Sequence, residues 1–378
     1  MGSNRLLCFS LGIVALALIW ATSLQAEPSP AGTQEFVFTS NFGDGTVSGF
    51  SVNSATGKLT KIKGSPFPAG VGAGPFAHSR NGRFLYLSLL LQYQGEPCGN
   101  EFAQLISYGI APATGDLSQL DDVTMPDYCP SSVVVDPTGK FVYVALIDFG
   151  DTKVGAIAAY ESKTGALTPV NGSPFLSPIE VPFGQQSAIG TLALSHDGTV
   201  LYASDPNDSA GLLIFDRDTS TSALTFRTTF NSGSAFGALA ITPSGKFLLA
   251  APPYGPGIYE YSIGTNGDLT AVAGSPFASP DNSVVNGISV SPNGEFVVIA
   301  EMGGIVVQRE TPKNGTLSLV PGSPFGGGLP PAVTFDPSGD IVYVPGTAFK
   351  IDKETGVLTK VSGFKTGSAP EAITALKP

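Results

Sequence analysis

Hydrophobic and polar residues alternate in short runs from Asn286 to Phe325, and copies of this pattern recur along almost the whole chain. The apolar stretches of this unit lie at 288–290, 296–300, 305–307 and 317–320. Turn residues separate them, and Asn314-Gly315 is a strong two-residue hairpin signal. Short apolar runs bounded by such turns are typical of β-strands. The unit is therefore predicted to be a four-stranded antiparallel meander.

The copies predict a closed ring. The turn after the first strand recurs six times, beginning at Ser79, Asp136, Ser195, Thr242, Ser291 and Asp336. The last hairpin recurs seven times, ending at Leu59, Leu117, Leu167, Leu224, Leu269, Leu317 and Leu358. The repeat starting at Phe36 lacks a first strand, and Ala369–Leu376 is a first strand with nothing after it. The chain is therefore predicted to be an all-β, seven-bladed β-propeller of four-stranded antiparallel blades, closed by the C-terminal strand completing the N-terminal blade.

The N-terminal segment, 1–26, reads as a secretory signal peptide, with Arg5 before an apolar stretch and Ala26 at the expected cut. An uncleaved anchor is the alternative, but the apolar run 6–20 is shorter than the ~20 residues that a spanning helix needs. Residues 27–35 are predicted to be a flexible leader, and 36–378 a single propeller domain. We expect export to the periplasm or the exterior and no membrane span after cleavage.

The net charge of the chain limits the kinds of molecule that it is expected to bind. The net charge is -11 and the pI about 4.6, with 13% charged residues. This balance argues against nucleic acid and anionic membrane surfaces. A small ligand, a glycan or a protein remains open as the partner, a monomer is expected, and no cofactor is predicted apart from a candidate calcium ion.

Two cysteines of the mature chain are predicted to lie on one face. Cys98 is in a long insertion, 92–102, between the second and third strands of the second blade, and Cys129 is in the following connector. Both segments emerge on the same face, here called the top. A disulfide between Cys98 and Cys129 is expected in an exported protein, and two free thiols are the alternative.

The same topology assigns charged residues to faces. The top face is expected to be acidic, with Asn41, Asp44, Glu96, Asp121, Asp122, Asp127, Asp148, Asp151, Glu180, Asp205, Asn207, Asp208, Asp281, Glu301 and Glu371. Glu371 begins a strand that lines the predicted channel, so it is a candidate base, with a solvated strand-end carboxylate as the alternative. The cationic groups His78, Arg80, His196 and Arg217 are expected toward the opposite face.

Two further features have competing interpretations. Asp205, Asn207 and Asp208 pack oxygen ligands into one top loop, as a calcium ion would require, but such residues also make ordinary polar turns. Gly-Ser-Pro-Phe recurs with its phenylalanine at Phe67, Phe175, Phe277 and Phe325. These rings are expected to pack between blades rather than form an aromatic binding ring.

Three stretches carry a resemblance to a known family: GPFAHSRNGRFLYLS, CPSSVVVDPTGKFVYVA and PPAVTFDPSGDIVYVP. Together with the Thr-Gly-x-Leu-Thr hairpins, they resemble the seven-bladed lactonase propellers, including 6-phosphogluconolactonase-like proteins, and the related YVTN propellers. The resemblance implies lactonase chemistry by His, Arg and acidic side chains at the channel mouth, often in Pro-Arg-His or His-Pro-His motifs. The matching places here are 74–78, 329–332 and 369–372, which read GPFAH, LPPA and APEA.

Two functional hypotheses follow. In the first, the chain is an exported binding module that contacts its ligand through the top-face loops, including the insertion with Cys98. In the second, it is a divergent lactonase that opens a sugar lactone at the channel mouth, with Glu371 as the base. Lactone hydrolysis requires a base for water and a donor or cation for the developing oxyanion. Lysines and backbone amides are the donors expected on the top face.

Overall fold

Seven antiparallel sheets succeed one another along the chain, each with four strands on its main path. The computed structural model describes residues 34–90, 92–93, 96–97, 103–125, 128–148, 154–179, 187–204, 211–253, 255, 257–280 and 284–378. The predicted signal peptide and nearly all of the predicted leader lie outside these residues. Within the described ranges, no helix is long and apolar enough to cross a membrane.

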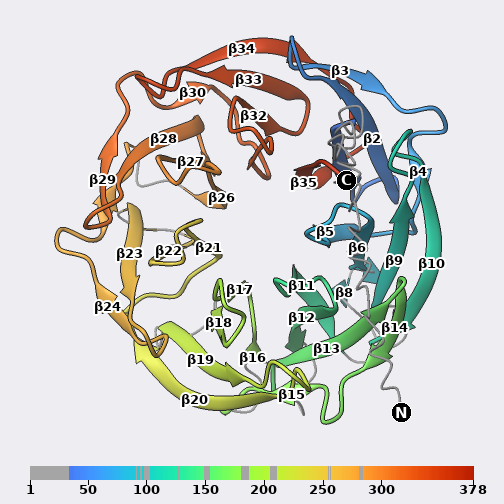
Figure 1. The fold of residues 1–378 in the computed structure, drawn as a ribbon, viewed down its shortest axis with the longest axis vertical. Coiled ribbons are helices and arrows are strands. Elements are labelled where there is room, and N and C mark those ends of the chain that lie inside the picture. The colour runs from blue at the N-terminus through green and yellow to red at the C-terminus, as the bar shows by residue number, and fades with distance from the viewer. Residues whose placement is uncertain are drawn as a thin grey trace, which may run out of the picture. The chain divides into compact units, whose positions relative to one another are not determined.

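The blades form a ring whose inner strands surround its centre (Figure 1). The inner strands are β35 (Pro370–Leu376), β5 (Ala73–His78), β11 (Cys129–Val135), β17 (Leu192–Leu194), β21 (Ala238–Ile241), β26 (Val285–Val290) and β31 (Thr334–Phe335). The second strands are β1 (Phe36–Asn41), β6 (Phe84–Leu89), β12 (Phe141–Asp148), β18 (Val200–Ser204), β22 (Phe247–Ala251), β27 (Phe296–Glu301) and β32 (Ile341–Val344).

The third and outer strands complete each blade. The third strands are β2 (Thr46–Asn53), β9 (Gln104–Ile110), β13 (Ala156–Lys163), β19 (Gly211–Arg217), β23 (Gly257–Ile263), β28 (Gly304–Thr311) and β33 (Thr347–Ile351). The outer strands are β3 (Lys58–Lys61), β10 (Leu117–Thr124), β14 (Ala166–Pro169), β20 (Leu224–Asn231), β24 (Leu269–Ala271), β29 (Thr316–Leu319) and β34 (Leu358–Gly363). A small hairpin, β7 (Gln92–Tyr93) with β8 (Glu96–Pro97), lies in the insertion, and β16 (Ser187–Ala188) pairs with β12.

The ring closes between its two ends, as predicted. Strand β35 pairs antiparallel with β1, from Phe36 opposite Leu376 to Asn41 opposite Pro370. Blade 1 is therefore built from β35, β1, β2 and β3, and the later blades follow in chain order. The predicted fold class and its mode of closure are both confirmed.

The hydrophobic core is divided among the junctions between blades. Each of seven clusters of buried residues joins two neighbouring blades. The second strands are buried on both faces, because each blade packs against a neighbour on either side. Among described residues, the cluster between blades 3 and 4 has thirteen buried members and the cluster between blades 7 and 1 has eight.

The four Gly-Ser-Pro-Phe segments form hydrogen bonds with the third strands of their blades. Their Ser-Pro peptide bonds are cis, and each serine hydroxyl accepts a backbone N–H from the adjacent third strand at 2.8–3.1 Å. Each phenylalanine begins a short strand paired to that third strand: β4 (Phe67–Pro68), β15 (Phe175–Leu176), β25 (Phe277–Ala278) and β30 (Phe325–Gly326). All four rings pack against the core clusters, so the packing prediction is confirmed.

Candidate functional site

Glu371 stands at the top end of the ring, where the inner strands begin. It is the second residue of β35, and its side chain is exposed. The connector before it is held by blade 1: the N–H of Gly367 donates to Asn41 Oδ1 at 3.0 Å, and the N–H of Ser368 to Asp44 Oδ2 at 2.8 Å. The surrounding protein still removes enough water to raise the pKa of the Glu371 carboxyl. The backbone that leads to Glu371 is therefore fixed, and an exposed carboxyl group marks this end.

Several other polar residues predicted for the top face have structural roles instead. Asn41 is fully buried, and Asp44 holds the last connector. Asp148 and Glu301 are buried, and the Ser279 hydroxyl donates to the Glu301 carboxylate. These groups are thus less available to a ligand than the sequence indicates. Of the top-face acids named from the sequence, Glu371 and Asp44 are described with exposed side chains near the start of β35.

The opposite end of the ring holds the imidazoles and a guanidinium, as expected. His78 ends β5, and together with Arg80 it lines two hollows of about 430 and 340 Å³. The smaller hollow also includes His196, and the larger includes Lys377. The Nδ1–H of His78 can donate to the Ser79 carbonyl at 2.9 Å, and burial lowers the pKa of the ring. A neutral imidazole and a cation therefore lie together, but far along the strand from Glu371.

The predicted calcium and disulfide sites fall largely outside the described residues. Asp205, Asn207 and Asp208 lie outside them, and within the described ranges no three acidic, histidine or cysteine side chains form a metal-binding group. Cys129 begins β11, is buried and is disulfide-bonded. Cys98 lies outside the described residues, so its pairing with Cys129 stays a prediction.

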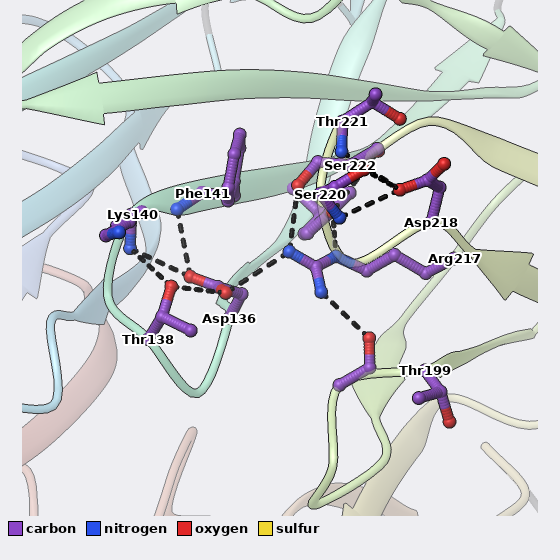
Figure 2. A network of polar contacts seen from close by, with 12 residues as sticks. Asp136, Thr138, Lys140, Phe141, Thr199, Arg217, Asp218, Ser220, Thr221 and Ser222 are labelled. Carbon is purple, nitrogen blue, oxygen red and sulfur yellow. Dashed lines mark hydrogen bonds and ion pairs between the residues drawn. The ribbon is translucent and has the colours of Figure 1, made fainter.

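A buried ion pair between blades 3 and 4 was not foreseen. Arg217, expected toward the opposite face, is the last residue of β19 and is buried against the Asp136 carboxylate, with 3.2 Å from its Nη2 to Oδ2 of Asp136. The guanidinium also donates to the Gly198 carbonyl at 2.9 Å and the Ser222 hydroxyl at 2.8 Å, and Nε donates to the Tyr143 hydroxyl. Figure 2 shows the guanidinium between the Asp136 turn and the Ser222 turn.

The guanidinium is also covered by aromatic rings. Its central carbon lies 5.4 Å from the ring centre of Phe141 and 5.7 Å from that of Tyr143. Its charge is therefore shared among a carboxylate, neutral acceptors and two rings, which is the environment that a buried cation requires. We assign this group to the stability of the junction.

A pair of buried carboxyl groups between blades 5 and 6 was also missed. Glu260 on β23 is fully buried, and neither of its carboxyl oxygens has a hydrogen-bond partner among described residues. Burial, and then the Glu310 carboxyl on β28, raises the pKa of Glu260 to about 9. Burial raises the pKa of Glu310 to about 7. Both groups therefore favour the protonated form in the folded protein.

Comparison with known proteins places the chain in a family. Residues 150–286 and 264–374 match the family model described as lactonase, seven-bladed β-propeller, and together these matches span more than half of the chain. The chain belongs to this lactonase family. No curated protein matches its sequence.

Solved structures share the fold of this lactonase-family chain. A candidate 6-phosphogluconolactonase from Bacteroides fragilis has a TM-score of 0.76 at 17% identity, with 93% of this chain and 100% of that chain covered. The periplasmic gluconolactonase of Pseudomonas aeruginosa has a TM-score of 0.72 at 18% identity, with 91% and 99% covered. At these identities the likeness establishes the fold alone.

Proposed function

We propose that this lactonase-family propeller is an exported binding module that holds its ligand at the top end of the ring, with Glu371 and the top-face loops. The observation that carries the proposal is the separation of charges along the axis. Glu371 is exposed where the inner strands begin, whereas the imidazoles and Arg80 lie where they end. An acidic end without a described His or Arg favours a neutral or cationic ligand, such as a glycan or a basic protein segment.

Lactone hydrolysis is the second candidate, and two observations favour it. The family match is one, and the raised pKa of Glu371 is the other. A carboxylate whose pKa moves toward neutrality is a better proton acceptor than an ordinary one while it remains largely ionised. In this candidate Glu371 removes a proton from water, and a backbone N–H or a lysine stabilises the oxyanion.

One experiment distinguishes the two candidates. The purified chain is assayed against phosphorylated and unphosphorylated sugar lactones, beside Glu371→Gln and the control Glu354→Gln. Glu354 is an exposed acid in an outer turn of blade 7, and no described contact involves its carboxylate. Turnover that is lost only with Glu371→Gln would establish the lactonase and overturn the binding proposal.

The remaining outcomes are also decisive. No turnover, together with glycan or peptide binding that Glu371→Gln weakens, supports the binding module. Turnover that survives Glu371→Gln but is lost with His78→Gln would place the chemistry at the opposite end and overturn both roles of Glu371. Binding is measured by calorimetry, because it requires no knowledge of a reaction product.

A further inference from the structure

The junction between blades 7 and 1 contains counterparts of two residues that contact Arg217 in the junction between blades 3 and 4. Asp336 occupies the turn position of Asp136. In both turns Oδ1 accepts the backbone N–H groups of the fourth and fifth following residues, at 2.7 and 2.8 Å from Asp336 and at 2.8 and 2.9 Å from Asp136. Tyr343, the third residue of β32, corresponds to Tyr143, the third residue of β12. Two of the acceptors around the guanidinium, the turn carboxylate and the tyrosine hydroxyl, therefore recur in the other junction, whereas Gly57 stands at the position of Ser222.

The guanidinium itself has no counterpart in this junction. Arg217 pairs with Leu224 in the last hairpin of blade 4, and Val52 pairs with Leu59 in the last hairpin of blade 1. Val52 therefore occupies in blade 1 the position that Arg217 occupies in blade 4. In place of the long side chain there is a cavity of about 610 Å³, which we call the closure pocket; it is lined by Glu35, Val52, Asp336, Ile341, Lys350 and Lys377, among others.

Two buried acceptors at this junction are unpartnered. Tyr343 is fully buried, and its hydroxyl makes no hydrogen bond to any described residue. Burial, then the nearby Glu35 and Asp336 carboxyls, raises the pKa of Tyr343. Glu35 Oε1 is likewise buried and unpartnered among described residues. A buried polar atom without a partner is costly to the fold, so a ligand that donates to these atoms is favoured.

Charges in the closure pocket are arranged by depth. Asp336 is buried, whereas Lys350 and Lys377 are exposed. The pKa of Glu35 rises to about 7 through burial and the Asp336 carboxyl, with a smaller opposing effect of Lys377. The lining also includes the half-buried Asp340, whose carboxylate is paired with Lys353. The floor therefore carries Asp336 and Glu35, and the two lysines that are unpaired among described residues lie at the rim. This arrangement suits a molecule whose cationic end reaches the acidic floor and whose anionic end meets the lysines at the rim.

We propose that the closure pocket binds a small guanidinium compound that also carries a carboxylate, of which free arginine is the simplest example. The guanidinium takes the place that Arg217 holds between blades 3 and 4, donating to the lining acceptors Asp336 Oδ2 and Glu35 Oε1. Tyr343 does not line the cavity; its hydroxyl is the deeper third acceptor, by analogy with Tyr143, which accepts from Arg217. Its planar fork of N–H donors matches carboxylate acceptors better than an ammonium does. The carboxylate meets the rim lysines. The cavity volume lies within the range of about 300–1,000 Å³ that is usual for small ligands.

The site is separate from Glu371. It lies at the end of the ring where β35 finishes, and none of its lining residues belongs to the top face. Arginine binding and lactone or glycan binding can therefore succeed or fail independently, and Glu371→Gln is expected to leave arginine binding unchanged.

Calorimetry with arginine, agmatine and lysine tests the proposal at about pH 8, where the Glu35 carboxyl is mostly ionised. Arginine is expected to bind, agmatine to bind more weakly because it lacks the carboxylate, and lysine to bind more weakly because it lacks the guanidinium. Glu35→Gln should weaken arginine binding at least about tenfold. Tyr343→Phe should weaken it about threefold or more, since one hydrogen bond is lost. The control Glu354→Gln should have no effect.

Val52→Arg supplies the missing guanidinium within the chain. It is expected to abolish arginine binding and to raise the melting temperature. If this variant does not fold, Glu35→Gln and Tyr343→Phe still decide the question. Absence of arginine binding, or binding that neither of these two variants weakens, overturns the proposal. Equal binding of arginine in a capped tripeptide, which has no free carboxylate, overturns the assignment to a small zwitterion.

Discussion

The junctions between blades 3 and 4 and between blades 7 and 1 share a turn aspartate and a buried tyrosine but differ at the position of Arg217, which is Val52 in blade 1. Both have the turn aspartate and the buried tyrosine, but Arg217 fills the first and Val52 leaves a cavity in the second. The first also has the larger cluster of buried hydrophobic residues among those described. A repeat can thus retain two of its acceptors while it loses the donor, and this leaves a cavity with unsatisfied polar atoms among described residues.

The junction between blades 5 and 6 offers a third arrangement. Here two carboxyl groups, Glu260 and Glu310, are buried near each other, and neither forms an ion pair among described residues. The three junctions therefore range from a satisfied ion pair, through an open pocket, to a pair of protonated acids. Each makes a different contribution to stability, and three predictions test that ordering.

The largest effect is expected from Arg217→Met. The variant leaves the Asp136 carboxylate and the Tyr143 hydroxyl buried without their donor, which should lower the free energy of unfolding by about 3–5 kcal/mol. Urea unfolding measures the change. The control is Arg227→Met, because Arg227 pairs with the more exposed Asp216 and should cost no more than about 1 kcal/mol. Equal losses in the two variants would contradict the central role of the buried pair.

A smaller effect is expected from pH at the Glu260–Glu310 pair. Both pKa values are raised in the folded state, to about 9 and about 7, so the fold favours the protonated groups. Their stabilisation is complete below about pH 4.5, the unfolded value, and is lost as pH rises toward about 9.

Glu260→Gln tests this dependence because the amide cannot ionise. At about pH 9 the variant should be more stable than the wild type by about 2 kcal/mol, a difference that should shrink at about pH 5. Thermal unfolding across this range measures it. The matched control is Glu295→Gln, an acid paired with Arg309 nearer the surface, which should not reproduce the effect. A wild-type curve parallel to that of Glu260→Gln would count against a buried protonated pair.

The smallest effect compares two tyrosines directly. Tyr143→Phe removes a hydroxyl that bonds Arg217 and the Ser222 carbonyl, and it should cost about 1–2 kcal/mol. Tyr343→Phe removes a hydroxyl with no described partner, and it should be neutral or slightly stabilising when no ligand is present. Chemical denaturation resolves the difference. A similar loss in both variants would mean that the closure pocket is already satisfied.

The blades and their closure could be predicted because local patterns specify them. Hairpin and turn residues repeat at regular spacing, and the unequal numbers of the two turn types identify β35 as the missing strand of blade 1. Glu371 also lies where the sequence placed it, at the start of β35 and exposed. Its chemical role stays a prediction, since placement alone does not determine activity.

The charged interior could not be predicted, for two physical reasons. In a propeller both faces of many second and third strands are covered, so alternation no longer separates core from solvent, and Glu260 between two tyrosines of β23 resembles an ordinary exposed acid. Arg217 meets a carboxylate 81 residues away, a distance set by the packing of blades. Likewise, the capping roles of Asn41 and Asp44 depend on a connector more than 320 residues later.

The pairing of β35 with β1 also bears on how the protein is made. Strand β1 is translated long before its partner β35, so the ring cannot close until residue 376 has been synthesised. A product released before Pro370 would present the bare edge of β1, and exposed edges recruit other chains into aggregates. Pairing with β35 therefore covers this edge of β1, and a chain that ends before Pro370 would leave it open.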